Sequence, residues 1–131
     1  MEFDFKGQTA IVTGGTRGIG RAVSEAFLKA GSKVIATYRS NEEEAKSFSE
    51  ANSSHSECLD IHRFDVTRYD EVENFFKETE EKHGAPQIVV VSSGIRADSI
   101  VGMMKTEDWK NVIDTNLTGT FNICKLAVQC M

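Results

Sequence analysis

The stretch "TGGTRGIG" (Thr13–Gly20) lies between a short apolar run and a segment with helical periodicity. We expect a strand over residues 8–13 and a helix over residues 17–30, whose apolar side chains recur every three or four positions and which Gly31 ends. The first backbone N–H groups of a helix have no partner within it, and the helix dipole favours negative charge there. This glycine-rich junction therefore indicates a site for a phosphate group.

Strand-like and helix-like segments alternate along the rest of the chain. An alternation of this kind predicts an α/β protein of the Rossmann type, a doubly wound parallel sheet in three layers with strand order 3-2-1-4. We expect one domain over residues 1–131. The further expected elements are a strand over 33–38, a helix begun by Ser40 or Asn41, a polar loop over 52–57, a strand ending near 63–66, a helix over 68–83 capped by Thr67 and Asp70 and ended by Gly84, a strand over 87–92, and a long final helix capped by Thr106.

Two apolar segments, one strand and the final helix, predict that additional chain or a partner packs against this sheet. The run Ile88–Val91 has no polar alternation, which is typical of a strand paired on both sides, yet the expected strand order leaves it at an edge. From Trp109 onward the final helix has apolar residues on nearly every face, and it reaches Met131 without a capping glycine. We therefore interpret the chain as truncated, and we expect it to associate with itself.

The composition excludes several classes of protein. The 131 residues are 40% hydrophobic and 27% charged, which is typical of a soluble globular domain, and no run is long enough to span a membrane. The net charge of -5 argues against nucleic acid as a partner. The three cysteines have no C-x-x-C spacing and favour reduced thiols in the cytoplasm, and the three histidines are too scattered to predict a metal site.

The setting of the glycines favours a dinucleotide over an empty turn. Gly14 permits a tight turn, Gly18 lets a pyrophosphate approach the backbone, and Gly20 lets the helix lie close to the sheet. A glycine pattern alone is weak, but here it follows a strand and opens a helix within a β-α-β unit. A glycine-rich turn without a ligand remains the alternative.

The end of the second strand distinguishes one dinucleotide from another. An acidic residue there would bind the ribose of NAD, but the sequence offers Arg39, with Arg17 in the glycine loop as a second cation. Arginine pairs with phosphate through two parallel hydrogen bonds, so we expect NADP(H). The alternative is that either arginine is a solvated surface charge.

These residues resemble the short-chain dehydrogenase/reductase family along the whole chain. "TGGTRGIG" fits the family's TGxxxGxG loop, "FDVT" (64–67) its Asp-Val pair, "VSSGI" (91–95) its N-N-A-G stretch, and "DTNLTG" (114–119) its catalytic asparagine. Residues 96–122 look most like 3-oxoacyl-[acyl-carrier-protein] reductases. The resemblance implies Asn116 as a catalytic residue and a cofactor site of Gly14, Thr16, Arg17, Gly18, Ile19, Gly20, Arg39, Asp65, Val66, Val91, Ser93 and Gly94, with Asp65 on the adenine amino group.

The sequence departs from the family pattern in two places. Val91 replaces an asparagine of N-N-A-G, and Ser92 and Ser93 either compensate or bond nearby backbone. The catalytic Tyr-x-x-x-Lys is absent, because Tyr38 and Tyr69 are followed four residues later by glutamates. We therefore expect these 131 residues to be inactive alone.

Resemblance implies that the whole protein is a cytoplasmic, homotetrameric, NADPH-dependent oxidoreductase of fatty acid biosynthesis. Its substrate would be a 3-oxoacyl group linked to acyl-carrier protein. Two alternatives remain open. One is an inactive nucleotide-binding or self-associating module, and the other is a reductase of a different carbonyl or alcohol.

Overall fold

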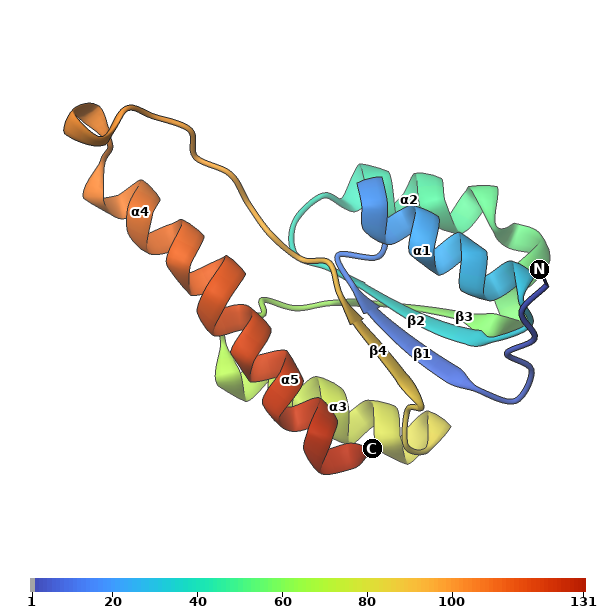
Figure 1. Ribbon diagram of the computed structural model, residues 1–131. Helices are drawn as coiled ribbons and strands as arrows, with labels where there is room; N and C mark the ends of the chain where they lie inside the picture. The colour runs from blue at the N-terminus through green and yellow to red at the C-terminus, as the bar shows by residue number, and fades with distance from the viewer. Residues whose placement is uncertain (1) are drawn as a thin grey trace.

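The computed structural model describes residues 2–131 and contains a four-stranded parallel sheet (Figure 1). Its strands are β1 (Thr9–Thr13), β2 (Lys33–Tyr38), β3 (Leu59–Arg63) and β4 (Ile88–Val91), in the order β3-β2-β1-β4. Ile11 of β1 lies opposite Ile35 on one side and Val89 on the other. The predicted doubly wound sheet and its 3-2-1-4 order are confirmed.

Helices cover both faces of the sheet (Figure 1). One face carries α1 (Gly18–Lys29) and α2 (Glu42–Ala51), and the other carries α3 (Tyr69–His83) and α5 (Gly119–Cys130). Between α4 (Thr106–Ile113) and α5 the helix continues through one π-helical stretch, η3 (Asp114–Thr118). Two 3-10 helices, η1 (Ser53–Cys58) and η2 (Val101–Met103), complete the structure; η1 occupies the segment predicted as a polar loop.

Alternation along the strands builds two separate apolar cores. Ile11 and Ile35 face α3 and α5 and pack with residues such as Phe75, while Val12 and Val34 face the opposite layer and pack with Phe48. Successive side chains of a strand point to opposite faces, so a strand whose residues are all apolar can supply both cores. This explains why β1 is buried at all five positions.

The structure corrects two of the predicted helix starts. Thr67 does not cap α3, because its backbone N–H and its hydroxyl both donate to Asp65, and Arg68 occupies the N-cap position. Thr106 is the first residue of α4 and not its cap, which is Lys105. In each case a threonine close to the helix start was mistaken for the capping residue itself.

Other ends match the sequence closely. Asn41 caps α2 by accepting a hydrogen bond from Glu44, and Gly84 ends α3 with a positive φ of 80°. The remaining differences at β1, α1 and β3 are small shifts at the ends of the elements.

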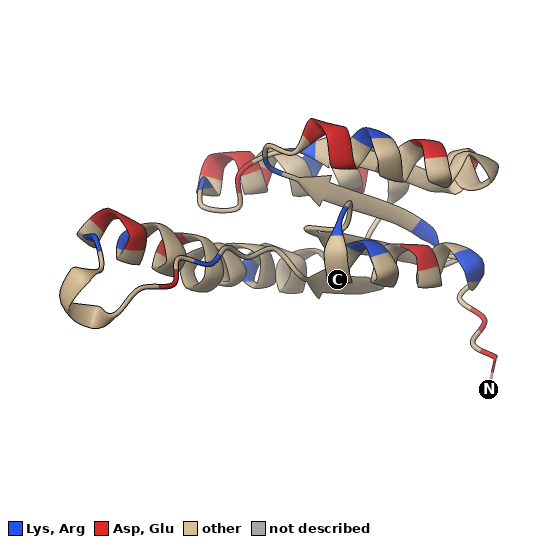
Figure 2. Ribbon diagram, turned by 90° about the horizontal axis from the view of Figure 1, so that it is seen from above, with Lys and Arg blue, Asp and Glu red and all other residues tan. Residues whose placement is uncertain are grey.

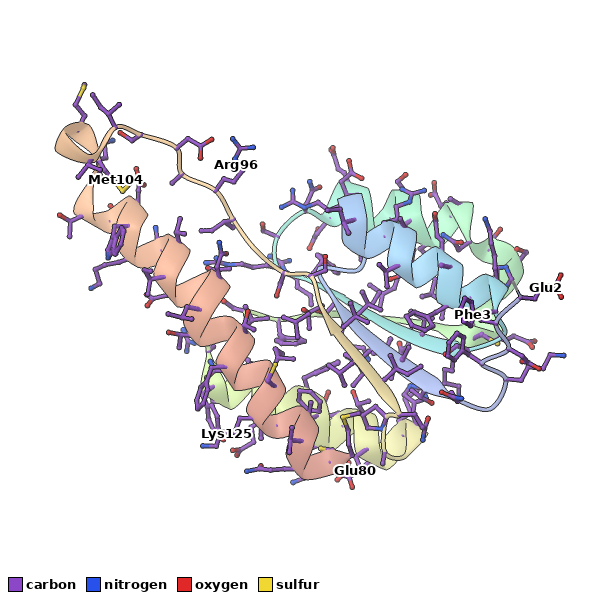
Figure 3. The ribbon with its side chains drawn as sticks, in the orientation of Figure 1. Glu2, Phe3, Glu80, Arg96, Met104 and Lys125 are labelled. Atoms are coloured by element: carbon purple, nitrogen blue, oxygen red, sulfur yellow. The ribbon has the colours of Figure 1, made fainter. Side chains whose placement is uncertain are left out.

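The final helix carries apolar side chains on several faces, as the sequence predicts, and within residues 2–131 several of them stay exposed. Only one stripe is buried, while Trp109, Leu117, Phe121 and Val128 are exposed. The segment that carries Arg96 and Met104, together with α4, extends away from the sheet (Figure 3). The buried stripe consists of Thr115, Gly119, Asn122, Ile123, Leu126 and Ala127.

β4 is an edge strand, as predicted, and within residues 2–131 only β1 pairs with it. Cys58, Cys124 and Cys130 are all free thiols. Over the same residues, the structure contains no helix of the length and apolarity that a membrane crossing requires. Charges of both signs are interspersed along the helices (Figure 2).

Candidate cofactor-binding site

A cavity of about 560 Å³ opens where the strands end and the helices begin. Its volume lies within the usual range for small-molecule sites, and the edge at which it lies is where doubly wound sheets bind ligands. The structure places three of the predicted site residues outside its lining, namely Asp65, Val91 and Asn116. The predicted residues that do line it are Gly14, Thr16, Arg17, Gly18, Ile19, Gly20, Arg39, Val66, Ser93 and Gly94.

Close packing explains the glycines at two positions of the loop. A Cβ atom on Gly14 would lie 2.9 Å from the Ser92 carbonyl oxygen, and one on Gly20 would lie 2.0 Å from the carbonyl oxygen of Gly14. Gly18 differs in its surroundings, because a Cβ there would have no heavy atom within 4 Å, although its φ of +55° is positive like that of Gly14. The loop is therefore tight against the protein at Gly14 and Gly20 and open at Gly18, as a phosphate cradle requires.

Two hydrogen bonds hold this loop in place. The hydroxyl of Ser24, which is fully buried in α1, donates to the Gly15 carbonyl at 2.9 Å. The Gly15 N–H donates to the Thr37 carbonyl at the end of β2, at 3.1 Å. The loop backbone is thus tied both to its own helix and to the neighbouring strand.

The starts of α1 and α2 differ in what they offer an anion. Arg17, the N-cap of α1, makes no capping hydrogen bond, and the first turn of α1 contains no acidic residue. The start of α2 is closed by the Asn41 side chain and carries three glutamates in its first turn. The positive end of a helix dipole and unpaired N–H groups attract anions, so α1 and not α2 presents the anion site.

Two arginines, Arg17 and Arg39, line the cavity, and Arg63 is bonded to the backbone of one of them. Arg39 lies with its Nε 3.2 Å from the Asp65 carboxylate, whereas Arg17 makes no ion pair within residues 2–131. Arg63 pairs with Glu42 and donates to the Arg39 carbonyl at 3.0 Å. The two arginines predicted to meet a 2′-phosphate therefore both line the cavity, one of them tethered.

The loop after β4 is bonded to β1 through its serines. The Ser93 hydroxyl lies 3.1 Å from the Thr13 hydroxyl, and the Ser92 N–H donates to the Thr13 carbonyl at 3.1 Å. Ser93 thus bonds a side chain of the neighbouring strand and not nearby turn backbone. Val91 itself lies in the sheet behind the cavity wall.

Asn116 braces the loop that follows β4. Its Oδ1 accepts a hydrogen bond from the Ile95 N–H at 2.8 Å, and its Nδ2 donates to the Ile95 carbonyl at 2.9 Å. Asn116 lies in the π-helical stretch η3, and Ile95 and Thr115 line the cavity. The asparagine therefore supports the cavity wall from behind, and its catalytic role stays a prediction.

Sequence reasoning missed several lining residues. Most of them lie in the last residues of a strand or within a few residues after it, so the carboxyl edge of the sheet would have predicted them once the strand ends were fixed. The pairing of Arg39 with Asp65 had no such signal, because it depends on how far two loops extend. The missed residues are Thr37, Tyr38, Ser40, Asn41, Phe64, Ser92, Ile95 and Thr115.

The histidines are less scattered than the sequence suggested. His62 and His83 each place Nε2 3.0 Å from Asp60 Oδ2, and Lys82 adds a contact at 3.1 Å. Burial raises the pKa of Asp60, but the hydrogen bonds from His83, His62 and Lys82 outweigh it and hold that pKa well below its usual range. In the described part of the chain, no group of three His, Cys, Asp or Glu residues could hold a metal ion.

Comparison with known proteins agrees with this fold. The sequence profile of the short chain dehydrogenase family matches residues 8–131. An acetoacetyl-CoA reductase of Paracoccus denitrificans is 39% identical over 88% of this chain and 46% of its own length. A 3-oxoacyl-[acyl-carrier-protein] reductase of Escherichia coli is 34% identical over 98% of this chain and 51% of its own.

A solved structure of the same family has the same fold. A short-chain dehydrogenase/reductase from Brucella melitensis, described as a glucose/ribitol dehydrogenase, superposes with a TM-score of 0.90 at 30% identity, over 99% of this chain and 55% of that one. The chain belongs to the short-chain dehydrogenase/reductase family, a family of oxidoreductases that bind a nicotinamide cofactor. It spans about half the length of the curated relatives it matches.

Proposed function

We propose that this chain binds NADP(H) as the cofactor-holding part of a reductase that acts on 3-oxoacyl thioesters. The observation that carries the proposal is the start of α1, which has no side-chain cap, no acid in its first turn, and an arginine without an ion pair within residues 2–131 at the cavity wall. A dinucleotide with a 2′-phosphate matches this combination of free N–H groups and cations.

The residues present fit such a cofactor. The glycine loop would hold the pyrophosphate, because its backbone is open at Gly18. Arg17 and Arg39 would bind the 2′-phosphate, and Asp65 with Val66 would hold the adenine. Ser93 and Gly94 would line the path toward the nicotinamide, which supplies a hydride when bound.

The substrate class is proposed from the relatives. Their names specify either acetoacetyl-CoA or a 3-oxoacyl group on acyl-carrier protein, and both are 3-oxoacyl thioesters. We favour the acyl-carrier-protein form and a role in fatty acid biosynthesis, with the coenzyme A form as the alternative. A homotetramer is the proposed assembly, and exposed apolar residues such as Trp109, Leu117 and Phe121 support self-association.

These 131 residues are proposed to bind the cofactor without turning it over. Asn116 is the one member of the family's catalytic set in this sequence, and its side chain is engaged with Ile95. Neither tyrosine is followed by a lysine four residues later, so no side chain here matches the family's proton donor.

Calorimetric titration of this chain with NADPH and NADH tests the proposal. We expect tighter binding of NADPH, a preference that Arg39→Ala reduces, and no oxidation of NADPH in the presence of acetoacetyl-CoA. Equal affinity for both cofactors contradicts the NADP(H) assignment. Binding of neither cofactor favours the self-associating module, and measurable turnover contradicts the inactivity of this chain.

A further inference from the structure

Asp65 contacts the mouth of the cavity indirectly, through Arg39. Asp65 lies two residues after β3 and Arg39 directly follows β2, and these strands are paired so that Tyr38 lies opposite Arg63. The distance from Arg39 Nε to Asp65 Oδ2 is 3.2 Å. Arg39 lines the cavity although its side chain is 55% exposed, so this ion pair is what ties it to the protein surface.

Thr67 fixes the orientation of the Asp65 carboxylate. Asp65 Oδ1 accepts hydrogen bonds from the Thr67 N–H at 2.9 Å and from the Thr67 hydroxyl at 2.7 Å. Both bonds fall on the same oxygen, and Oδ2 is left to face Arg39. The threonine predicted to cap α3 therefore holds a carboxylate instead.

A tether at Nε leaves the rest of the guanidinium for another partner. Arg39 makes no second ion pair within residues 2–131, so its terminal nitrogens have no competing carboxylate there. Arginine loses rotamer freedom when it is fixed, and a side chain already restrained loses less of it on binding. Restraint by Asp65 therefore favours any anion that meets Arg39 at the cavity.

We propose that Asp65, oriented by Thr67, is a positioning residue that sets the preference for NADP(H) by holding Arg39 at the cavity mouth. The proposal rests on the proposed function, since it needs a 2′-phosphate at Arg39. It gives Asp65 a role beyond the adenine contact that the family resemblance implies. One carboxylate then links recognition of the base with recognition of the ribose phosphate.

A double-mutant cycle between Asp65→Asn and Arg39→Ala tests this role. The probes are adenosine 2′,5′-bisphosphate and 5′-AMP, which differ only in the 2′-phosphate, and calorimetry gives the ratio of their dissociation constants. With Arg39 present, we expect Asp65→Asn to lower the preference for the 2′-phosphate about threefold, the range of a partly exposed ion pair. In the R39A background the same substitution should change the ratio by less than about 1.5-fold, because coupled residues are not additive.

Matched variants separate positioning from folding and from net charge. Thr67→Val removes one of the two bonds to Asp65 Oδ1 and should lower the ratio in the same direction, whereas Thr67→Ser keeps the hydroxyl and should keep the ratio. Asp70→Asn makes the same charge change at the exposed start of α3, near Arg68, and should leave the ratio unchanged. Thermal melts of each variant confirm that it is folded.

The possible results are distinct. An equal change in both backgrounds, no change in either, or a rise in the preference overturns the positioning role of Asp65. If the unmodified chain already binds both probes equally, the NADP(H) assignment fails as well, and the positioning role fails with it. A clear preference in the unmodified chain with an uncoupled cycle overturns only the role of Asp65.

Discussion

The two ends of the parallel sheet differ in whether their polar groups have hydrogen-bond partners within the protein. At the carboxyl end, the glycine loop and the start of α1 leave backbone N–H groups uncapped, and Arg17 makes no ion pair within residues 2–131. At the amino end, Asp60 is bonded to two histidines and a lysine, and the Thr9 N–H donates to the Gln87 side chain at 2.7 Å. Polar groups at the carboxyl end are therefore available to a ligand, whereas those at the amino end already bond each other.

This difference shows how to tell a binding site from a structural network in one small sheet. Buried or crowded polar groups are normally satisfied, so donors left without partners at a cavity indicate that a ligand completes them. A charged cluster whose members satisfy each other indicates stability instead. Changes at the carboxyl end should therefore alter ligand binding, with or without an effect on folding, and changes at the amino end should alter folding alone.

The largest effect is expected from Gly20→Ala in the glycine loop. The added Cβ would lie 2.0 Å from the Gly14 carbonyl oxygen, so α1 must move away from the loop. We expect loss of measurable NADPH binding in calorimetry and a decrease of about 3 kcal/mol in the free energy of unfolding by urea. Gly102→Ala is the control, because a Cβ there has no heavy atom within 4 Å, and its melt and binding should match the unmodified chain.

Asp60→Asn, at the amino end, should lower stability without weakening NADPH binding. The substitution removes the charge that His62, Lys82 and His83 share, and His83 is only 9% exposed. We expect the free energy of unfolding to fall by about 2 kcal/mol at pH 7, with NADPH affinity unchanged within about twofold. A variant as stable as the unmodified chain but weaker in binding contradicts the division between the two ends.

The same carboxylate should give the chain an acid-sensitive stability. The pKa of Asp60 is lower in the folded state than in the unfolded state, so the unfolded chain takes up its proton first as the pH falls. Its contribution to stability is present above the usual carboxyl pKa of about 4 and is lost progressively below it. Urea melts between pH 3 and 7 should show a smaller decline for Asp60→Asn than for the unmodified chain; equal declines exclude this role.

Arg17→Ala should have a smaller effect, confined to binding. Removing a cation from the cavity wall should weaken NADPH binding about tenfold, or ~1.4 kcal/mol, and leave NADH binding and the melt unchanged. Arg63→Ala is the matched comparison, because Arg63 is already paired with Glu42 and does not line the cofactor cavity. If both variants weaken NADPH equally, general surface charge and not the open end of α1 attracts the phosphate.

The smallest effect is expected from Lys82→Ala. Lys82 contacts Asp60, but its side chain is 65% exposed, and exposed ion pairs contribute little. We expect a loss of under about 0.5 kcal/mol in the free energy of unfolding. A loss as large as that of Asp60→Asn would mean that Lys82, and not the largely buried His83, dominates the network.

Periodic features of this chain were predictable from its sequence, and contacts between distant loops were not. The strand over residues 33–38 and the buried stripe of α3 follow from local patterns that the core then reinforces. The glycines of residues 14–20 were predictable for the same reason, because their spacing is local. The pairs Arg39–Asp65 and Asp60–His83 join residues 23 to 26 positions apart, and their meeting depends on strand register.

The capping errors have a related cause. A threonine before a helix can cap it or bond another side chain, and local sequence does not distinguish the two. At Thr67 the Asp65 carboxylate, two residues earlier, takes both donors. The apolar side chains around the final helix were predictable from local sequence, whereas the π-helical stretch η3 within it was not.

The π-helical stretch Asp114–Thr118 makes the length of this segment as important as its composition. Each residue of a regular α-helix advances about 100°, and the i→i+5 turns of a π-helix take in one residue more than the i→i+4 turns of an α-helix. Deleting one residue within η3 could therefore restore regular turns and leave Ile123 and Ala127 facing the core, although it would disturb the bonds of Asn116 to Ile95. Deleting one residue at the start of α5 instead would rotate Ile123 and Ala127 by about 100° away from the core.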